Sequence, residues 1–214
     1  MSKNKARLSY ICAGLAAAGA SYLLWIRPWL LTWGAAADER WKTLPGDQFI
    51  PEPDASATRA ITIDAPPDRV WPWLAQIGQG RGGFYSYAWL ENMAGCQIVN
   101  AQKVHAEWQE VKVGDQVLLH PNFPAIPVAL VDPNHALVLG GKGIPEKGIP
   151  PVTWSFVIET APRHATRLIV RWRVRTTGSV SDALMYKYML EPIHFIMERK
   201  MMLGIKARAE GRKG

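Results

Sequence analysis

Arg81, Tyr85 and Glu91 are the residues of this chain whose types and spacing could do chemistry. They lie in the stretch GQGRGGFYSYAWLEN, residues 78–92, which places four glycines around Arg81. Glycine takes φ > 0 without penalty and lets other groups approach the backbone, so the stretch ends one element and redirects the chain. A guanidinium, a phenol and a carboxylate that meet around an apolar pocket are a usual composition of a small-molecule site. A structural interpretation is also open, in which Arg81 pairs with Glu91 and fixes the glycine-rich loop.

Nucleotide binding is the sharpest alternative for this stretch, because Gly78, Gly80 and Gly83 fit the dinucleotide fingerprint G-x-G-x-x-G. The fingerprint needs a buried strand before it and an acidic residue about 20 residues after it. Here Pro66 and Pro67 begin the preceding segment as a helix rather than a central strand, and no strand ending in Asp or Glu is expected near that offset. The sequence therefore predicts a glycine-rich connection between two short helices.

No motif for nucleophilic catalysis, metal binding or cofactor binding occurs elsewhere in the chain. The five histidines are scattered without an H-E-x-x-H spacing, and Cys12 and Cys96 are too far apart in the expected fold to pair. The net charge of +7 is concentrated at the two ends, where it suits an anionic membrane surface at least as well as nucleic acid. We expect no metal, no cofactor and no nucleic-acid partner.

The N-terminal segment predicts a single membrane-spanning helix. Residues 8–26 carry no charge, and as a helix they cover about 28 Å at 1.5 Å per residue, enough for the hydrocarbon core. Trp25, Trp29 and Trp33 gather at one end as an aromatic belt. The basic flank, residues 1–7, favours the cytoplasmic side and places the body on the outer, periplasmic face. A cleaved signal peptide with its site at residues 35–37 is the alternative, and we favour the retained anchor.

The rest of the chain predicts one domain, residues 58–210, joined to the anchor, residues 8–33, by an irregular tether, residues 34–57. Short strands are expected at residues 111–113, 117–120, 128–131 and 136–139. Two long strands follow, from about residue 152 and from about residue 167, with a strict period of two. That period predicts one buried face and one solvent-exposed face that carries Arg167, Arg171, Arg173 and Arg175.

The last predicted element is a long helix at residues 182–209, which Pro192 should kink. One stripe of this helix is polar and contains Lys187, Glu191, His194 and Glu198. The other stripe is apolar and is expected to face the sheet; it contains Met185, Met189, Ile193, Ile196, Met197 and Met201. Methionines on such a face give an adaptable wall for an irregular apolar ligand, although ordinary core packing also accounts for them.

Three segments make the chain similar to a known family. The run ITIDAPPDRVWPWLAQIGQGRGGFYSYAWLENMAG, the segment VGDQV at residues 113–117 and the closing EPIHFIMERKMMLGIKARAE resemble bacterial proteins of the START-like superfamily, also called SRPBCC. The resemblance covers about residues 33–209. It implies an α+β helix-grip fold, in which a curved antiparallel sheet wraps around a long C-terminal helix with an apolar cavity between them. It implies no particular reaction, because lipid carriers and polyketide cyclases both belong to the superfamily.

Two functions follow as hypotheses. The first is a membrane-tethered module that binds or transfers a lipid, an isoprenoid or a polyketide-like molecule, with Arg81 on its polar end. The second is an enzyme of the cyclase or aromatase type that uses Tyr85, Glu91 or His120 as general acid or base. The resemblance implies that Arg81, Tyr85 and Glu91 lie near the mouth or wall of the cavity, and we expect His120 there as well. The full set of candidate ligand-binding residues is Arg81, Tyr85, Glu91, Trp108, His120, Trp154, Trp172, Met189, Ile193 and Met197.

Overall fold

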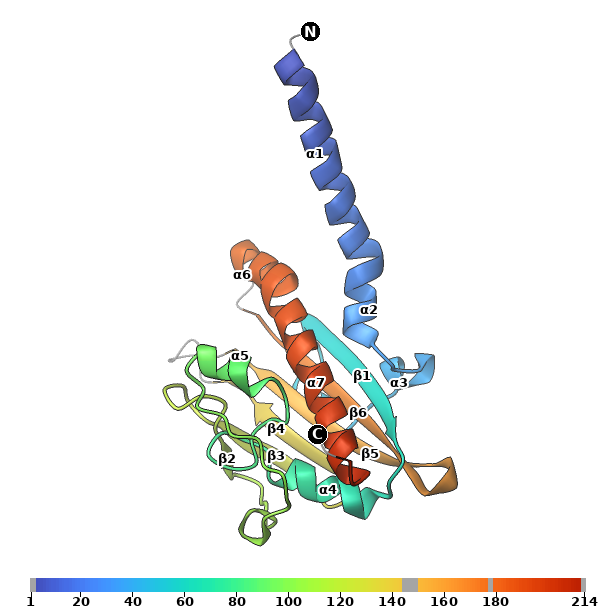
Figure 1. Cartoon of the computed structure of the whole chain (residues 1–214), viewed down its shortest axis with the longest axis vertical. Helices are drawn as coiled ribbons and strands as arrows, with labels where there is room; N and C mark the ends of the chain where they lie inside the picture. Colours follow the sequence, from blue (N-terminus) through green and yellow to red (C-terminus); the bar gives the residue numbers. More distant parts are fainter. Residues whose placement is uncertain (1–2, 144–149, 177–178, 213–214) are drawn as a thin grey trace.

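The computed structural model describes residues 3–143, 150–176 and 179–212 and has an α+β architecture. A six-stranded antiparallel sheet curves around a C-terminal helix, and a long N-terminal helix projects away from this body (Figure 1). The expected class, a curved antiparallel sheet with a C-terminal helix, is therefore confirmed.

The sheet has the order β1-β6-β5-β4-β3-β2. Its strands are β1 (Ala55–Ile63), β2 (Gln116–Val117), β3 (Ile126–Asp132), β4 (Ala136–Gly141), β5 (Val152–Ala161) and β6 (Ala165–Val174). β5 and β6 form a hairpin of two ten-residue strands. Of the alternating apolar side chains predicted there, Phe156, Leu168 and Val170 are fully inaccessible, whereas Trp154 and Trp172 are partly exposed. The strand expected at residues 111–113 is absent, because the Asp115 carboxylate accepts a hydrogen bond from the Lys112 amide and closes a turn there.

Two short helices flank the glycine-rich stretch, as expected. They are α4 (Pro67–Ala75) and α5 (Ala88–Met93). The chain between them turns back on itself, with Gly78 and Gly83 exchanging backbone hydrogen bonds at 3.0 Å. Gly83 has φ +73°, and a Cβ there would lie 2.6 Å from the Asn100 side chain. The glycines therefore serve a closed turn packed under Asn100, and this turn does not open a helix N-terminus as a nucleotide loop does.

The C-terminal helix consists of α6 (Val180–Met185), a π-helical turn η6 (Tyr186–Leu190) and α7 (Glu191–Ala209). The irregularity expected at Pro192 occurs just before it, because proline lacks the amide that a regular turn would use. The lower half of α7 packs on the sheet and α4 through Met201, Met202 and Ile205.

The predicted face of the upper half of this helix is wrong. Glu191 and Glu198, assigned to the polar stripe, are 3% and 2% exposed, whereas Met189 and Ile193, assigned to the sheet, are 59% and 51% exposed. The reason is that both carboxylates have arginine partners from other elements: Arg27 lies 2.7 Å from Glu191, and Arg59 pairs with Glu198. A buried carboxylate is tolerated when a charge partner compensates its desolvation, so the apolar stripe is turned outward.

The N-terminal segment is one continuous helical rod of α1 (Lys3–Ser21), a π-helical turn η1 (Tyr22–Ile26) and α2 (Arg27–Thr32). Residues Tyr10–Thr32 are long and apolar enough to cross a membrane. The last part of this rod also belongs to the body, because Leu30 is buried and the Trp29 ring packs edge-on against Phe195 of α7 at 5.1 Å.

The tether covers the outer face of the sheet through α3 (Ala37–Trp41) and the short helix η2 (Asp47–Phe49). The expectation of a solvent-exposed arginine face is therefore wrong for its central members. Arg171 is buried, Arg167 is paired with Glu39 at 2.6 Å, and Arg173 contacts Asp47, while Arg175 remains exposed. Alternation along a strand cannot show that another segment of the chain will cover the second face.

Candidate ligand cavity

A cavity of about 310 Å³ lies between the sheet and α7. Its walls are mainly apolar and aromatic and come from β3 to β6, from α7 and from the chain around α5. The lining residues are Phe84, Ser86, Glu91, Cys96, Leu119, Ile126, Leu139, Val152, Trp154, Trp172, His194, Met197, Glu198 and Met201. A neighbouring hollow of about 460 Å³ shares Leu119, Ile126 and Val152 with it. Mainly apolar walls with a few polar groups are what small-molecule sites have in common.

Glu91 is the polar group of the cavity that no other described residue satisfies. Its Oε2 atom is buried and has no hydrogen-bond partner among the described residues. Burial in this apolar wall raises the pKa of the Glu91 carboxyl to about 7. The carboxyl is therefore divided between its acid and its carboxylate at neutral pH, and it can donate or accept a hydrogen bond inside the cavity.

Ser86 and the turn that holds it are already hydrogen bonded. The Ser86 hydroxyl donates to the Met197 carbonyl at 2.8 Å and so links this turn to α7. Asn100 donates to the Ser86 carbonyl at 3.0 Å and accepts from the Tyr85 amide at 2.6 Å. Tyr85 itself has φ 56°, a left-handed conformation that these contacts stabilise.

A buried network of Arg59, Glu198, Trp154 and His194 closes one wall of the cavity. Arg59 and Glu198 are each 1% exposed and form an ion pair, and the Trp154 indole donates to Glu198 Oε1 at 2.8 Å. Arg59 also donates to the Leu30 carbonyl of α2 at 2.7 Å. Desolvation lowers the pKa of His194, so its imidazole is neutral beside this pair. Both charges are compensated, and the network orients the Trp154 ring at the cavity wall.

Four of the ten residues predicted from the sequence line this cavity: Glu91, Trp154, Trp172 and Met197. Arg81 does not line it and does not contact Glu91. Its guanidinium donates to the Ala75 carbonyl at 3.0 Å and to the Trp108 carbonyl at 2.9 Å. Arg81 therefore fixes the glycine-rich loop, as the structural interpretation required, although through backbone carbonyls rather than through a carboxylate.

The other predicted site residues also lie elsewhere. The Tyr85 hydroxyl is buried and donates to the Trp73 carbonyl at 3.0 Å, and desolvation raises its pKa. Trp108 lies against the His105 ring at 4.4 Å. His120 contacts the Ala94 carbonyl at 3.1 Å. Met189 and Ile193 are on the outer side of the C-terminal helix.

Sequence reasoning missed Ser86, Cys96 and His194, which line the cavity. Ser86 was within reach of such reasoning, because it follows Tyr85 inside the glycine-rich motif. His194 was assigned to the stripe turned away from the sheet, so an error in the helix face removed it from the site. Cys96 carries no sequence signal for a cavity position.

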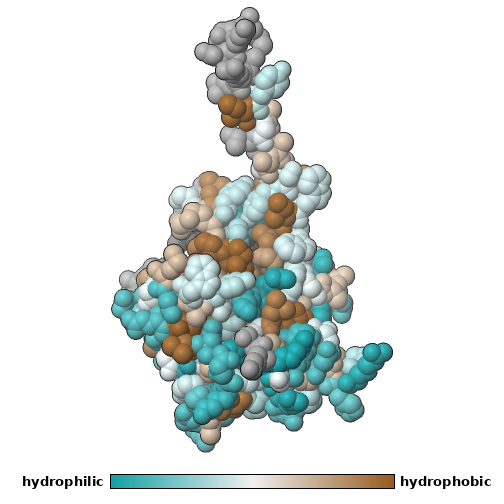
Figure 2. Space-filling model, viewed as in Figure 1, coloured by the Kyte–Doolittle hydropathy of each residue, from teal (hydrophilic) through white to brown (hydrophobic). Residues whose placement is uncertain are grey.

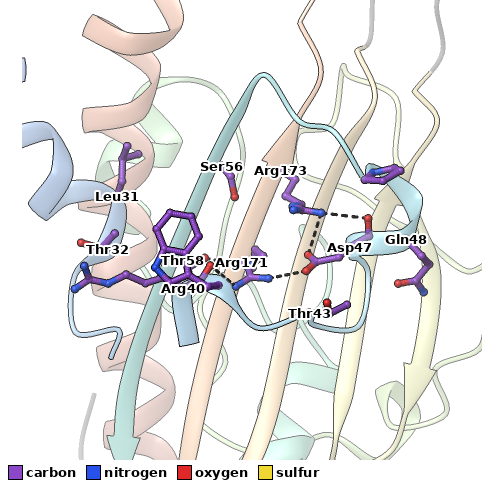
Figure 3. A pocket seen from close by; sticks show the side chains of 12 residues that line it. Leu31, Thr32, Arg40, Thr43, Asp47, Gln48, Ser56, Thr58, Arg171 and Arg173 are labelled. Atoms are coloured by element: carbon purple, nitrogen blue, oxygen red, sulfur yellow. Dashed lines mark hydrogen bonds and ion pairs between the residues drawn. The ribbon is translucent and has the colours of Figure 1, made fainter. Parts of the chain in front are cut away.

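A larger hollow, of about 570 Å³, lies on the outer face of the sheet beneath α2 and the tether. Figure 3 shows the Arg171 and Arg173 side chains directed at Asp47. Arg171 donates all five of its N–H groups, to the Thr58 hydroxyl, the Asp47 carboxylate and three backbone carbonyls of residues 39–42. The Arg171 guanidinium therefore has no free donor and holds the tether in place. The cavity under α7, with its mainly apolar walls, is the better candidate site for an apolar ligand.

Fold and cavity together define a class of protein in which a curved sheet and a C-terminal helix enclose an apolar cavity beside a membrane-length helix. No protein-family model and no curated protein matches this sequence. Among solved structures, the Aha1 dimer from Colwellia psychrerythraea is 16% identical, with 75% of this chain and 99% of that chain covered and a TM-score of 0.41. A protein from Thermobifida fusca is 9% identical over 74% of this chain and 97% of its own, with a TM-score of 0.44. CalU16 from Micromonospora echinospora is 12% identical over 73% of this chain and 84% of its own, with a TM-score of 0.35. At these identities and TM-scores we take neither a ligand nor an activity from them.

Proposed function

We propose that this protein is a membrane-tethered module that binds or transfers a hydrophobic small molecule, of lipid, isoprenoid or polyketide type, in the cavity under α7. The observation that carries the proposal is an apolar cavity of about 310 Å³ with the Glu91 carboxyl in its wall, whose buried Oε2 atom has no hydrogen-bond partner among the described residues. Trp154, Trp172 and Met197 hold the apolar body of the ligand by burying its surface. Glu91 hydrogen-bonds a hydroxyl or carbonyl group at the polar end of the ligand, the role that the sequence had assigned to Arg81.

The N-terminal anchor supports a membrane origin for the ligand. The segment Tyr10–Thr32 has the length and composition of a membrane span. Lys3, Lys5 and Arg7 before it favour an orientation with the body on the outer, periplasmic face. A body held at a bilayer encounters lipid-soluble molecules at high local concentration.

A cyclase-type enzyme is the second candidate, and one observation favours it. A carboxyl with a pKa of about 7 is matched to proton transfer at neutral pH, and Glu91 is placed to act on a bound carbonyl compound. Of the three acid or base residues considered from the sequence, Glu91 alone lines the cavity, so it is the one of the three that such an enzyme would use. Glu91→Gln would then abolish turnover of an enolisable ligand while the cavity still bound it, whereas a carrier has no turnover to lose.

Photolabelling tests the binding proposal. Full-length protein in phospholipid nanodiscs is irradiated with a diazirine-bearing fatty acid, and labelled peptides are mapped by mass spectrometry. We expect labels on peptides that contain Glu91 or Trp154. Met197→Trp adds an indole inside the cavity and should remove those labels, because the probe and the new ring compete for the same volume.

Ile196→Trp is the matched control, since it adds the same ring one residue away on the exposed side of α7. It should leave cavity labelling unchanged. Equal cavity labelling in the Met197→Trp and Ile196→Trp proteins, or no cavity labelling in the wild type, would refute the proposal.

A further inference from the structure

The part of the N-terminal helix that projects from the body is too short to cross the hydrocarbon core of a bilayer by itself. α1 projects away from the body, and its uncharged part, residues 8–21, covers about 21 Å at 1.5 Å per residue (Figure 1). The hydrocarbon core of a bilayer is about 30 Å thick. The next residues of the rod, Tyr22–Ile26, must therefore also lie in the apolar layer if the helix crosses it.

Those residues are attached to the C-terminal helix. The Tyr22 ring lies 5.5 Å from the Tyr188 ring, and the Tyr22 hydroxyl donates to the Lys187 carbonyl at 2.7 Å. One turn further on, Arg27 forms two hydrogen bonds with Glu191, at 2.7 and 2.8 Å. Whatever depth Tyr22–Ile26 reaches, Tyr186–Leu190 reaches as well.

The surface at this depth is apolar on both helices. Figure 2 shows hydrophobic residues gathered on the body just below the projecting helix. The side chains that carry this apolar collar are Leu23, Leu24, Trp25, Ile26 and Trp29 from the rod, and Leu184, Met185, Tyr188, Met189, Leu190, Ile193 and Ile196 from the C-terminal helix; each is between 41% and 71% exposed. Residues 184–196 contain two charged side chains, and one of them, Glu191, is neutralised by Arg27. Apolar side chains gathered in this number mark an interaction surface rather than the scattered exposure of single residues.

We propose that the apolar collar is embedded in the outer leaflet of the bilayer, with residues 184–196 lying beside the anchor at the level where the hydrocarbon begins. The occupant is lipid, because the collar continues the surface of a membrane-length helix and the required depth of Tyr22–Ile26 brings Tyr186–Leu190 to the apolar layer. Lys187, the exposed cation of the segment, lies where it can reach the phosphate layer. Burial of these side chains in lipid accounts for the outward turn of the methionine stripe.

The embedded segment also contacts the cavity wall. The Tyr186 ring of η6 is stacked on Trp172 at 5.0 Å, and His194 lies 5.4 Å from the same indole. This places one cavity wall directly under the collar. If the proposed function holds, the ligand passes between bilayer and cavity along this wall without crossing water.

Spin-label accessibility tests the collar in the full-length chain. In a Cys12→Ala, Cys96→Ala background reconstituted into nanodiscs of phosphatidylcholine and phosphatidylglycerol, Met189→Cys and Ile193→Cys are each labelled. Power saturation then compares collisions with oxygen, which concentrates in hydrocarbon, and with Ni(II)-EDDA, which stays in water. Val113→Cys is the control, because Val113 is an apolar side chain of similar exposure, 66%, on a turn of the body.

We expect oxygen to dominate at residues 189 and 193 and Ni(II)-EDDA to dominate at residue 113. Dominance of Ni(II)-EDDA at both collar positions would overturn the proposal, because the face would then be in water. Low accessibility to both reagents would also overturn it, since a second copy or another protein would cover the face. The outcome is independent of photolabelling: oxygen dominance without cavity labels would keep the collar and reject the proposed function.

Discussion

Glu91→Gln should make the protein more stable above neutral pH. The buried carboxyl has its pKa raised from 4.5 to about 7, so the folded protein holds this proton more tightly than the unfolded chain. The stability linked to it is complete below pH 4.5 and is lost as the pH rises through about 7. One pKa unit is worth about 1.4 kcal/mol for a fully buried group, and solvent screening of this partly exposed side chain reduces the cost at high pH to about 1–2 kcal/mol. Glutamine keeps the shape and stays neutral, so it avoids the cost.

The assay is urea unfolding of the full-length protein in detergent micelles, followed by tryptophan fluorescence at about pH 5 and about pH 8. The informative quantity is the difference in unfolding free energy between variant and wild type, because every other ionisable group is common to both proteins. We expect a small difference at the lower pH, and at the higher pH a gain for Glu91→Gln of about 1–2 kcal/mol. Glu110→Gln is the control, since it makes the same substitution at a side chain that is 87% exposed.

One result would refute this reasoning. If Glu91→Gln follows the wild type at both pH values, or is less stable at the higher one, the carboxyl is ionised and partnered in the folded protein. The cavity would then contain a fixed anion rather than a neutral acid, and its ligand would need a cationic group.

Three further predictions concern the supports of the cavity and use the same unfolding assay. Arg59→Met strands a buried Glu198 carboxylate and should cost about 3–5 kcal/mol, most of it recovered by Glu198→Met in the double variant; a double variant as unstable as the single one would contradict this. Arg81→Ala removes two partly buried hydrogen bonds to backbone carbonyls and should cost about 1.5–3 kcal/mol with cavity photolabelling unchanged. If the Arg81→Ala protein instead lost cavity photolabelling and kept the stability of the wild type, Arg81 would have to be a ligand-binding residue after all. Gly204→Ala places a Cβ 2.3 Å from the Tyr85 carbonyl and should cost about 1–3 kcal/mol, so an unchanged unfolding curve would show that α7 can shift.

Local patterns in the sequence were sufficient to predict the main helices and strands. The strict alternation in β5 and β6 and the glycine-rich connection between two short helices were predicted and are present. The uncharged N-terminal run predicted one helix of membrane length, and the rod fulfils that prediction in length and composition. These features depend on neighbours within a few residues, which a single sequence displays directly.

The faces of these elements were decided by partners distant in the chain. The amphipathic pattern of the C-terminal helix predicted that its methionines face the sheet. In the upper half of the helix the buried side chains are instead Glu191 and Glu198. Their partners are Arg27, 164 residues before Glu191, and Arg59, 139 residues before Glu198. Arg171 is buried because residues 39–47 of the tether supply acceptors for its donors. Arg81 and Glu91 are ten positions apart in one motif, but the first contacts backbone carbonyls and the second lines the cavity. A charged side chain can be buried where another part of the folded chain compensates its charge. The sequence shows which residues are charged, but it does not show which distant segment will lie against them.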